Sequence, residues 1–184
     1  MSSKTVASSS EAIDILIVID TEYVKKNYPT PSQDPLAPTG IDHNSQFMIC
    51  SDPRGGISGQ GTADLNFRAN PGDTVWFRGT SIYQNSDDAV IIYAITYWKQ
   101  DHVFNQFTPV LVKRNRAIMP DVNTPNGLPA IQGPVSFTSL NTTVKQSGQE
   151  YFLVYFALYT LGTDGQSQNL FGYYSWDPSC TVPA

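Results

Sequence analysis

The chain has 184 residues, enough for one domain with a well-filled core. Charged residues make up only 15% of it, and the net charge is −5 with a pI near 4.8. This balance argues against nucleic acid as a partner, because contact with phosphates needs clusters of basic residues. The only such cluster, Lys113 to Arg116, is expected to be a solvated strand end.

The N-terminal segment and the cysteines bear on location. Residues 1–11 are predicted to be a disordered polar leader without the apolar core of a secretory signal. No stretch approaches the roughly 18 apolar residues of a membrane span, so no membrane insertion is expected. Cys50 and Cys180 make no disulfide framework in a chain of this length, and two reduced thiols in a cytoplasmic protein are expected. Pairing of the two cysteines and export without a cleaved signal are left open.

Short runs of β-forming residues, many alternating with period two, predict strands along the whole chain. In chain order they are Ala12–Asp20, Ser45–Ser51, Thr62–Ala69, Thr74–Ser81, Ala89–Gln100, Phe107–Lys113, Val135–Ser139, Tyr151–Leu161 and Leu170–Trp176. Both faces of Ala89–Trp98 are apolar, which predicts a central strand.

Pro and Gly residues separate these runs. Pro71–Asp73 is predicted to be a tight turn, and Val24–Tyr28 could form one helical turn. The Pro-rich connections at 29–44 and 116–134 are long for loops. We expect them to cross between sheets, to cover a sheet edge or to contact a neighbouring subunit.

The most apolar part of the chain is a predicted hairpin. Tyr151–Leu161 (YFLVYFALYTL) leads through Gly162–Gly165 into Asn169–Trp176 (NLFGYYSW), and Asp-Gly in a short loop is a strong hairpin signal. Because so apolar a strand cannot face water, it is predicted to lie in mid-sheet under a second layer. The sequence therefore predicts an all-β, single-domain antiparallel β-sandwich over 12–178, with Greek-key or jelly-roll-like connections and a tail at 179–184.

Familiar catalytic patterns are missing from the sequence. The glycine-rich stretch Gly55–Gly61 follows no Rossmann pattern and has no phosphate-loop Lys, so it is expected to be a β loop. The histidines His43 and His102 form no zinc-binding spacing. The pair Asp101-His102 could act as a general base, but a solvated strand end explains it as well. No cofactor is expected.

Two binding sites are candidates. Asp87 and Asp88 lie in an oxygen-rich segment that could hold calcium, although turn chemistry explains it equally well. Aromatic rings beside polar groups at strand ends could bind a glycan or another small polar ligand, although such aromatics are also typical of cores and subunit contacts. The ligand-binding candidates are Trp98, His102, Tyr174, Trp176 and Asp177.

Three segments are distinctive in their order and spacing. They are Asp14–Tyr23 (DILIVIDTEY), Gly59–Leu65 (GQGTADL) with Gly72-Asp73, and Gly172–Pro178 (GYYSWDP). Together they resemble the bacterial inclusion-body protein family, the PixA/AidA-like proteins, over nearly the whole chain. The resemblance implies bacterial proteins, some of which form intracellular inclusions and some of which are made under quorum-sensing control in host-associated bacteria. It brings no catalytic residues.

Two main hypotheses follow. The first is a non-enzymatic, abundant inclusion-body protein of the cytoplasm that forms homo-oligomers, because few charges would have to be desolvated between copies. The second is a lectin-like glycan-binding module, assisted by calcium if Asp87 and Asp88 bind the ion. An enzyme that uses Asp101-His102 is a third, weaker alternative.

Overall fold

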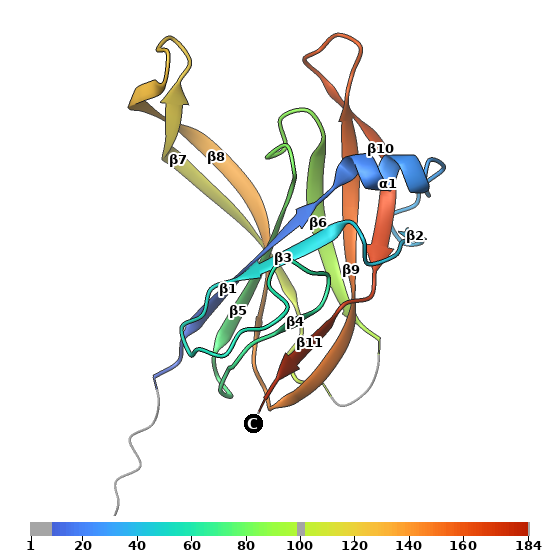
Figure 1. Ribbon diagram of the computed structural model, residues 1–184, viewed down its shortest axis with the longest axis vertical. Coiled ribbons are helices and arrows are strands. Elements are labelled where there is room, and N and C mark those ends of the chain that lie inside the picture. Colours follow the sequence, from blue (N-terminus) through green and yellow to red (C-terminus); the bar gives the residue numbers. More distant parts are fainter. Residues whose placement is uncertain (1–8, 99–101, 184) are drawn as a thin grey trace, which may run out of the picture.

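Two β-sheets packed face to face make up the computed structural model, which describes residues 9–98 and 102–183 (Figure 1). The strands are β1 (Ala12–Ile19), β2 (Thr39–Gly40), β3 (Gln46–Cys50), β4 (Leu65–Asn66), β5 (Thr74–Ser81), β6 (Ala89–Tyr97), β7 (Thr108–Asp121), β8 (Gly127–Thr143), β9 (Gly148–Leu161), β10 (Gln168–Trp176) and β11 (Ser179–Val182). One short helix, α1 (Thr21–Asn27), lies where a helical turn is predicted. Among the described residues no helix is long and apolar enough to cross a membrane.

The two sheets have mixed topology. The five-stranded sheet has the order β3-β1-β5-β8-β7, and the six-stranded sheet has the order β2-β10-β9-β11-β4, with β6 also paired to β9. Most neighbours are antiparallel, but β1 runs parallel to β5, β2 to β10, and β4 to β11. The predicted all-β single domain is confirmed, with the difference that neither sheet is purely antiparallel.

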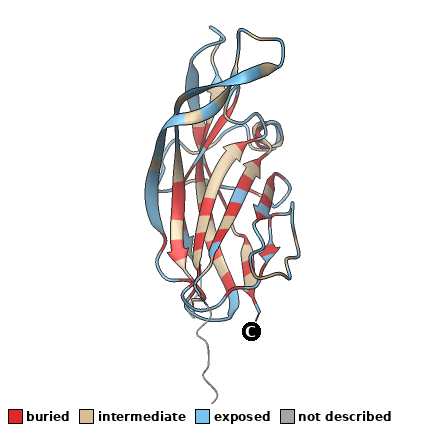
Figure 2. Ribbon diagram, turned by 90° about the vertical axis from the view of Figure 1, so that its left-hand side faces the viewer, coloured by how far each residue is buried: buried red, intermediate tan, exposed pale blue. Residues whose placement is uncertain are grey.

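The alternating residues of β1 and β9 build the core between the sheets. Every second residue of β1 from Ile13 to Ile19 is buried, and β9 buries Phe152, Val154 and Phe156 in the same way. Figure 2 shows these buried positions within the sandwich, whereas the β7–β8 hairpin is mostly exposed. The strand β9 has β6 on one side and β10 and β11 on the other, so its predicted central position is confirmed.

Several segments differ from the sequence prediction. The residues predicted as a tail include β11, which pairs with both β9 and β4, so the sheet continues to Val182. The predicted strand Thr62–Ala69 is reduced to β4, because its flanking residues form turns around Gly61 and Pro71. Most of the predicted leader, residues 1–8, lies outside the described residues.

The strand β6 is an edge strand in the part of the chain that the structure describes, whereas a central strand is predicted. Its only strand neighbour there is β9. A groove and not a second strand lies beside it, and Ile91 in that groove is 43% exposed. The connection 29–44 covers an edge, which is one of the expected alternatives, because its strand β2 pairs with β10.

The connection 116–134 is not a loop between sheets. It forms the outer part of a long hairpin in which β7 and β8 pair from Thr108–Asn141 to Asp121–Gly127. The strand β5 pairs with β8 only from Thr143 to Ser139, so the hairpin leaves the sandwich beyond that point (Figure 1). Lys113 to Arg116 therefore lies in the middle of β7 and not at a strand end. We call residues 110–138 the arm.

The arm leaves the sandwich next to a close contact between the two sheets, at Gly79 of β5 and Ile92 of β6. A Cβ atom at Gly79 of β5 would lie 2.2 Å from Cγ1 of Ile92 in β6. No side chain fits in that space, so glycine is required there for steric reasons. Ile92 is itself buried, and therefore has little room to move away.

We expect Gly79→Ala to lower the free energy of unfolding by about 1–3 kcal/mol, the usual cost of overpacking a core. Chemical denaturation measures this change. Gly40→Ala is the matched control, because a Cβ atom at Gly40 meets nothing within 4 Å and the effect there should be small. Equal losses in the two variants would contradict the steric explanation.

Candidate functional surface: the arm and the groove at its base

The arm carries apolar side chains that no part of the described chain covers. Leu111 is 85% exposed and Ile118 71% exposed, and at the far end Val122 and Leu128 are 89% and 63% exposed. Exposed apolar residues that occur singly are ordinary, but a series along one projecting element is typical of an interaction site.

A two-stranded ribbon is marginally stable in water when nothing packs on it. Beyond Ser139 the strands of the arm have only each other as strand neighbours among the described residues. The root is well anchored, since Asn105 donates its backbone N–H to the carbonyl of Thr143 and Val144 donates to that of Asp73. The arm is therefore held firmly at one end and unsupported along its length.

Prolines restrict how the arm can associate. Pro109 and Pro120 lie in β7, and Pro129 and Pro134 lie in β8. Each proline lacks a backbone N–H and interrupts the ladder that an added strand would need. The arm can therefore bind a partner better through its side-chain faces than by strand addition.

A groove of about 540 Å³ separates the base of the arm from β6. The arm contributes Leu111–Lys113 and Ser136–Thr138, and the body contributes Gly79 and Ala89–Ile92. Asn85 and Gln168 close one end, where the Gln168 amide donates to the carbonyls of Asn85, Ser86 and Asp87. The groove thus has an apolar wall on the body, a wall of mixed polarity on the arm and a polar lip.

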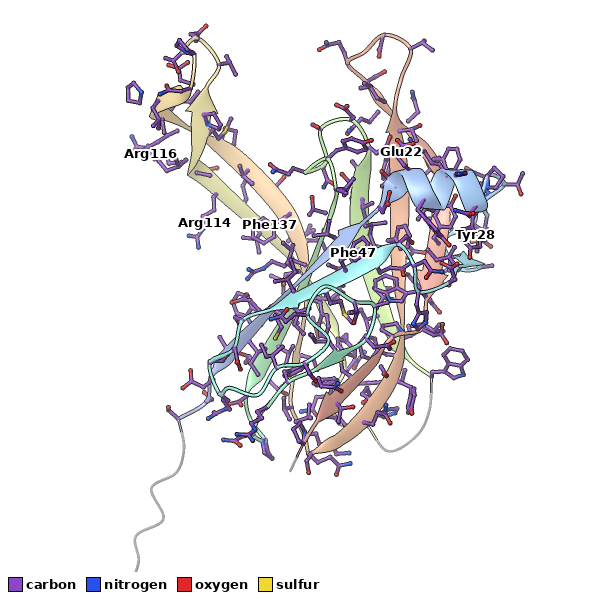
Figure 3. All side chains as sticks on the ribbon, viewed as in Figure 1. Glu22, Tyr28, Phe47, Arg114, Arg116 and Phe137 are labelled. Carbon is purple, nitrogen blue, oxygen red and sulfur yellow. The ribbon has the colours of Figure 1, made fainter. Side chains whose placement is uncertain are left out.

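Charge differs between the arm and that lip. Arg114 and Arg116 extend from the side of the arm that faces away from the body (Figure 3), and neither contacts a carboxylate of the described residues within 4.0 Å. At the lip, Lys25 pairs with both Glu22 and Asp88 at 2.7 Å, and Asp87 next to them is exposed. The arm is therefore basic and the lip is acidic.

The predicted aromatic site is not assembled on one surface. Tyr174 and Trp176 are buried, where their rings lie 5.5 and 6.0 Å from that of Phe156. The Tyr174 hydroxyl donates to the carbonyl of Tyr28, and burial raises its pKa. Neither ring can stack on a ligand in this conformation, because both belong to the core. Sequence alternation could not separate them from exposed aromatics, since both faces of β10 carry apolar residues.

The other two ring-bearing candidates lie close together in the sequence. Trp98 follows β6 and is 54% exposed. The His102 ring stacks on Tyr97 at 3.7 Å, and its Nδ1 lies 3.4 Å from the buried carboxylate of Glu150. Asp101, the predicted partner of His102, lies outside the described residues.

The two acids proposed for calcium differ in environment. Asp88 is buried beside Lys25, whereas Asp87 is exposed. Within residues 9–98 and 102–183, no three or more His, Cys, Asp or Glu side chains are grouped to hold a metal ion. Cys50 and Cys180 are both buried free thiols, and burial raises the pKa of each.

Asp177, the last ligand candidate, belongs to a charged cluster that the sequence analysis missed. His43 lies between two carboxylates, with Nε2 3.1 Å from Asp177 and Nδ1 3.3 Å from Asp64. Asp64 also accepts the backbone N–H of Ser179. The three residues lie far apart in the sequence, so no local pattern predicts their contact.

The fold and this surface define a two-sheet β-sandwich protein with a projecting hairpin arm. The family model described as PixA, inclusion body protein, matches residues 11–182, so the chain belongs to the PixA inclusion body protein family. The crystal structure of the inclusion body protein PixA from Burkholderia cenocepacia J2315 is similar, with a TM-score of 0.76 and 29% sequence identity, and the match covers 97% of this chain and 99% of that one. No curated protein matches the chain.

The His43 cluster predicts a pH-dependent contribution to stability. Burial alone would lower the pKa of His43, but its hydrogen bonds to Asp177 and Asp64 outweigh burial and raise the pKa above 6.5. Because the folded-state pKa is the raised one, the stabilisation is fully present below about pH 6.5 and is lost as pH rises through the raised value. His43→Gln should therefore lower the melting temperature at about pH 5.5 and have less effect at about pH 8.5. A difference in melting temperature that stays constant over this range would show that the histidine charge contributes nothing.

Proposed function

We propose that this protein is a non-enzymatic inclusion protein of the bacterial cytoplasm that works by self-association. The observation that carries the proposal is the arm, whose apolar side chains are exposed beyond the sandwich. Membership of a family described as inclusion body proteins supports the same function. Abundant synthesis under quorum-sensing control in a host-associated bacterium, which the family resemblance implies, belongs to this proposal.

Physical chemistry supports assembly through such an element. Burial of apolar surface stabilises association by about 25 cal/mol for each Å² removed from water. Charged residues are only 15% of the chain, so contacts between copies desolvate few charges.

The purified protein should associate as its concentration rises, and sedimentation velocity over a wide concentration range measures this. Leu111→Asp should weaken association by at least about tenfold, because it places a charge in the contact. Leu36→Asp is the matched control: Leu36 is 90% exposed but lies in the segment between α1 and β2, outside the arm and the groove. A wild-type protein that stays monomeric at every concentration would overturn the proposed function.

A second candidate function, glycan binding, is favoured by one observation. Trp98 has an exposed indole and directly follows Tyr97, on whose ring the His102 ring stacks. A flat aromatic face of this kind can bind a sugar ring, and His102 can add a hydrogen bond. This proposal does not use Tyr174 or Trp176, which lie in the core.

If glycan binding occurs, Trp98→Ala should abolish it while leaving the fold intact, because the indole is half exposed. A glycan array, screened with and without calcium, measures binding, and circular dichroism checks the fold. Ile82→Ala is a control at another exposed apolar side chain, which is 54% exposed. Binding that survives in Trp98→Ala would exclude this site, and calcium-independent binding would exclude a role for Asp87 and Asp88.

A further inference from the structure

We propose that two copies of this protein interlock through their arms, with the arm of each copy lying in the groove between the arm and β6 of the other. This inference rests on the proposed self-association and names the surface that performs it. The occupant is a second copy because one molecule carries both halves of the contact: an unsupported arm with exposed apolar side chains, and a groove at its base whose body wall is apolar. In a two-fold dimer each arm then binds the groove of the other copy, so neither copy keeps an unpaired binding surface.

The faces of the arm fit this arrangement. Leu111 pairs with Thr138 on the face that continues from Leu140, which belongs to the core of the sandwich. Arg114 pairs with Val135 on the opposite face, which Phe137 shares. In two interlocked arms the inner faces meet each other, so Leu111 contacts the partner's arm. The outer faces then meet the partner's body.

The charges fit the same arrangement. Arg114 lies on the outer face, and the side chains of Arg114 and Arg116 both point away from their own body (Figure 3). In the partner's groove this face lies towards the acidic lip, where Asp87 is exposed. Opposite charges on the arm and on the lip favour this pairing and reject the reverse orientation. Both arginines, which pair with no carboxylate among the described residues of their own molecule, thereby gain partners.

The length of the arm is sufficient for the contact. The strand from Gly127 to Thr138, at about 3.3 Å per residue, spans roughly 35–40 Å. That is about the width of a small domain, so the arm can pass through the partner's groove and reach beyond it. The prolines on both strands favour side-chain packing in the groove over addition to the free edge of β6.

Charge exchange between two variants tests the proposal. The arm variant carries Arg114→Glu and Arg116→Glu, and the lip variant carries Asp87→Lys. Either variant alone should dissociate, because like charges face each other at both contacts. A mixture should form a mixed dimer, because the acidic arm of one variant then faces the basic lip of the other, and the unchanged arm faces the unchanged lip. Sedimentation velocity measures the recovery, and we expect the dissociation constant of the mixture to fall at least about tenfold below that of either variant alone.

A control separates specific pairing from general attraction. Asp52→Lys changes an exposed acid that follows β3, outside the groove, and gives the same net charge as the lip variant. The arm variant mixed with Asp52→Lys should show no recovery. Recovery equal to that with the lip variant would overturn the assigned contact.

Disulfide trapping gives a second readout that does not depend on charge. Val135→Cys places a thiol on the outer face of the arm, and Ile91→Cys places one on β6 in the groove. The native cysteines are buried, so they do not compete. A mixture of the two variants should form a mixed disulfide dimer under mild oxidation. Val135→Cys mixed with Ile49→Cys, at an exposed site on β3, should form far less of it.

The outcomes distinguish this inference from the proposed function. In one outcome the wild-type protein associates, but the charge-exchanged mixture shows no recovery and the arm–groove thiols form no disulfide. That result overturns the interlocked arms and leaves self-association standing. A wild-type protein that remains monomeric overturns both. If the arm instead binds a different protein or a lipid surface, the wild-type protein is monomeric alone, and the inference fails by the same measurement.

Discussion

The contact of Gly79 with Ile92 is the constraint on which the shape of the molecule depends. The strand β5 stays paired with β1 as far as Ser81, but it gives up β8 after Arg78. At the next residue, Ile92 of the opposite sheet lies where a side chain of β5 would be. The two sheets therefore meet at this point, while β8 is no longer held by β5 and extends away with β7. The groove lies between β6, which stays with the body, and the diverging β7–β8 hairpin.

A second set of contacts keeps the base of the arm fixed. The buried carboxylate of Asp73 pairs with Arg54 and accepts the backbone N–H groups of Glu11 and Asn70. Burial alone would raise its pKa, but these contacts outweigh burial and lower the pKa. Its backbone carbonyl accepts the N–H of Val144, directly after β8. Asp73 thus joins the root of the arm to the start of β1 and to the turn before β5. A long element can project into solvent because its base is tied to the core in this way.

Alternation along a strand allowed much of the body to be predicted. Runs such as Thr74–Ser81 have one buried and one half-buried face, and the period-two pattern of the sequence reflects that difference. The arm shows no such pattern, because both of its faces are largely exposed and its prolines are typical of loops. Its strand pairing is visible only in three dimensions. The aromatic candidates failed to form one site for the opposite reason: β10 is apolar on both faces, so its sequence cannot show that Tyr174 and Trp176 point into the core.

If copies of this protein assemble as proposed, the prolines in β7 and β8 limit the kind of solid that they would form. Ordered fibres of the cross-β type grow when strands add to open edges without interruption, and they rarely redissolve. Pro120 on one strand of the arm, and Pro129 and Pro134 on the other, lack backbone N–H groups that such growth uses. Copies held together by side-chain faces keep their native fold, and their contacts loosen on dilution. Under the proposed assembly, such a deposit would be a reversible store of folded protein.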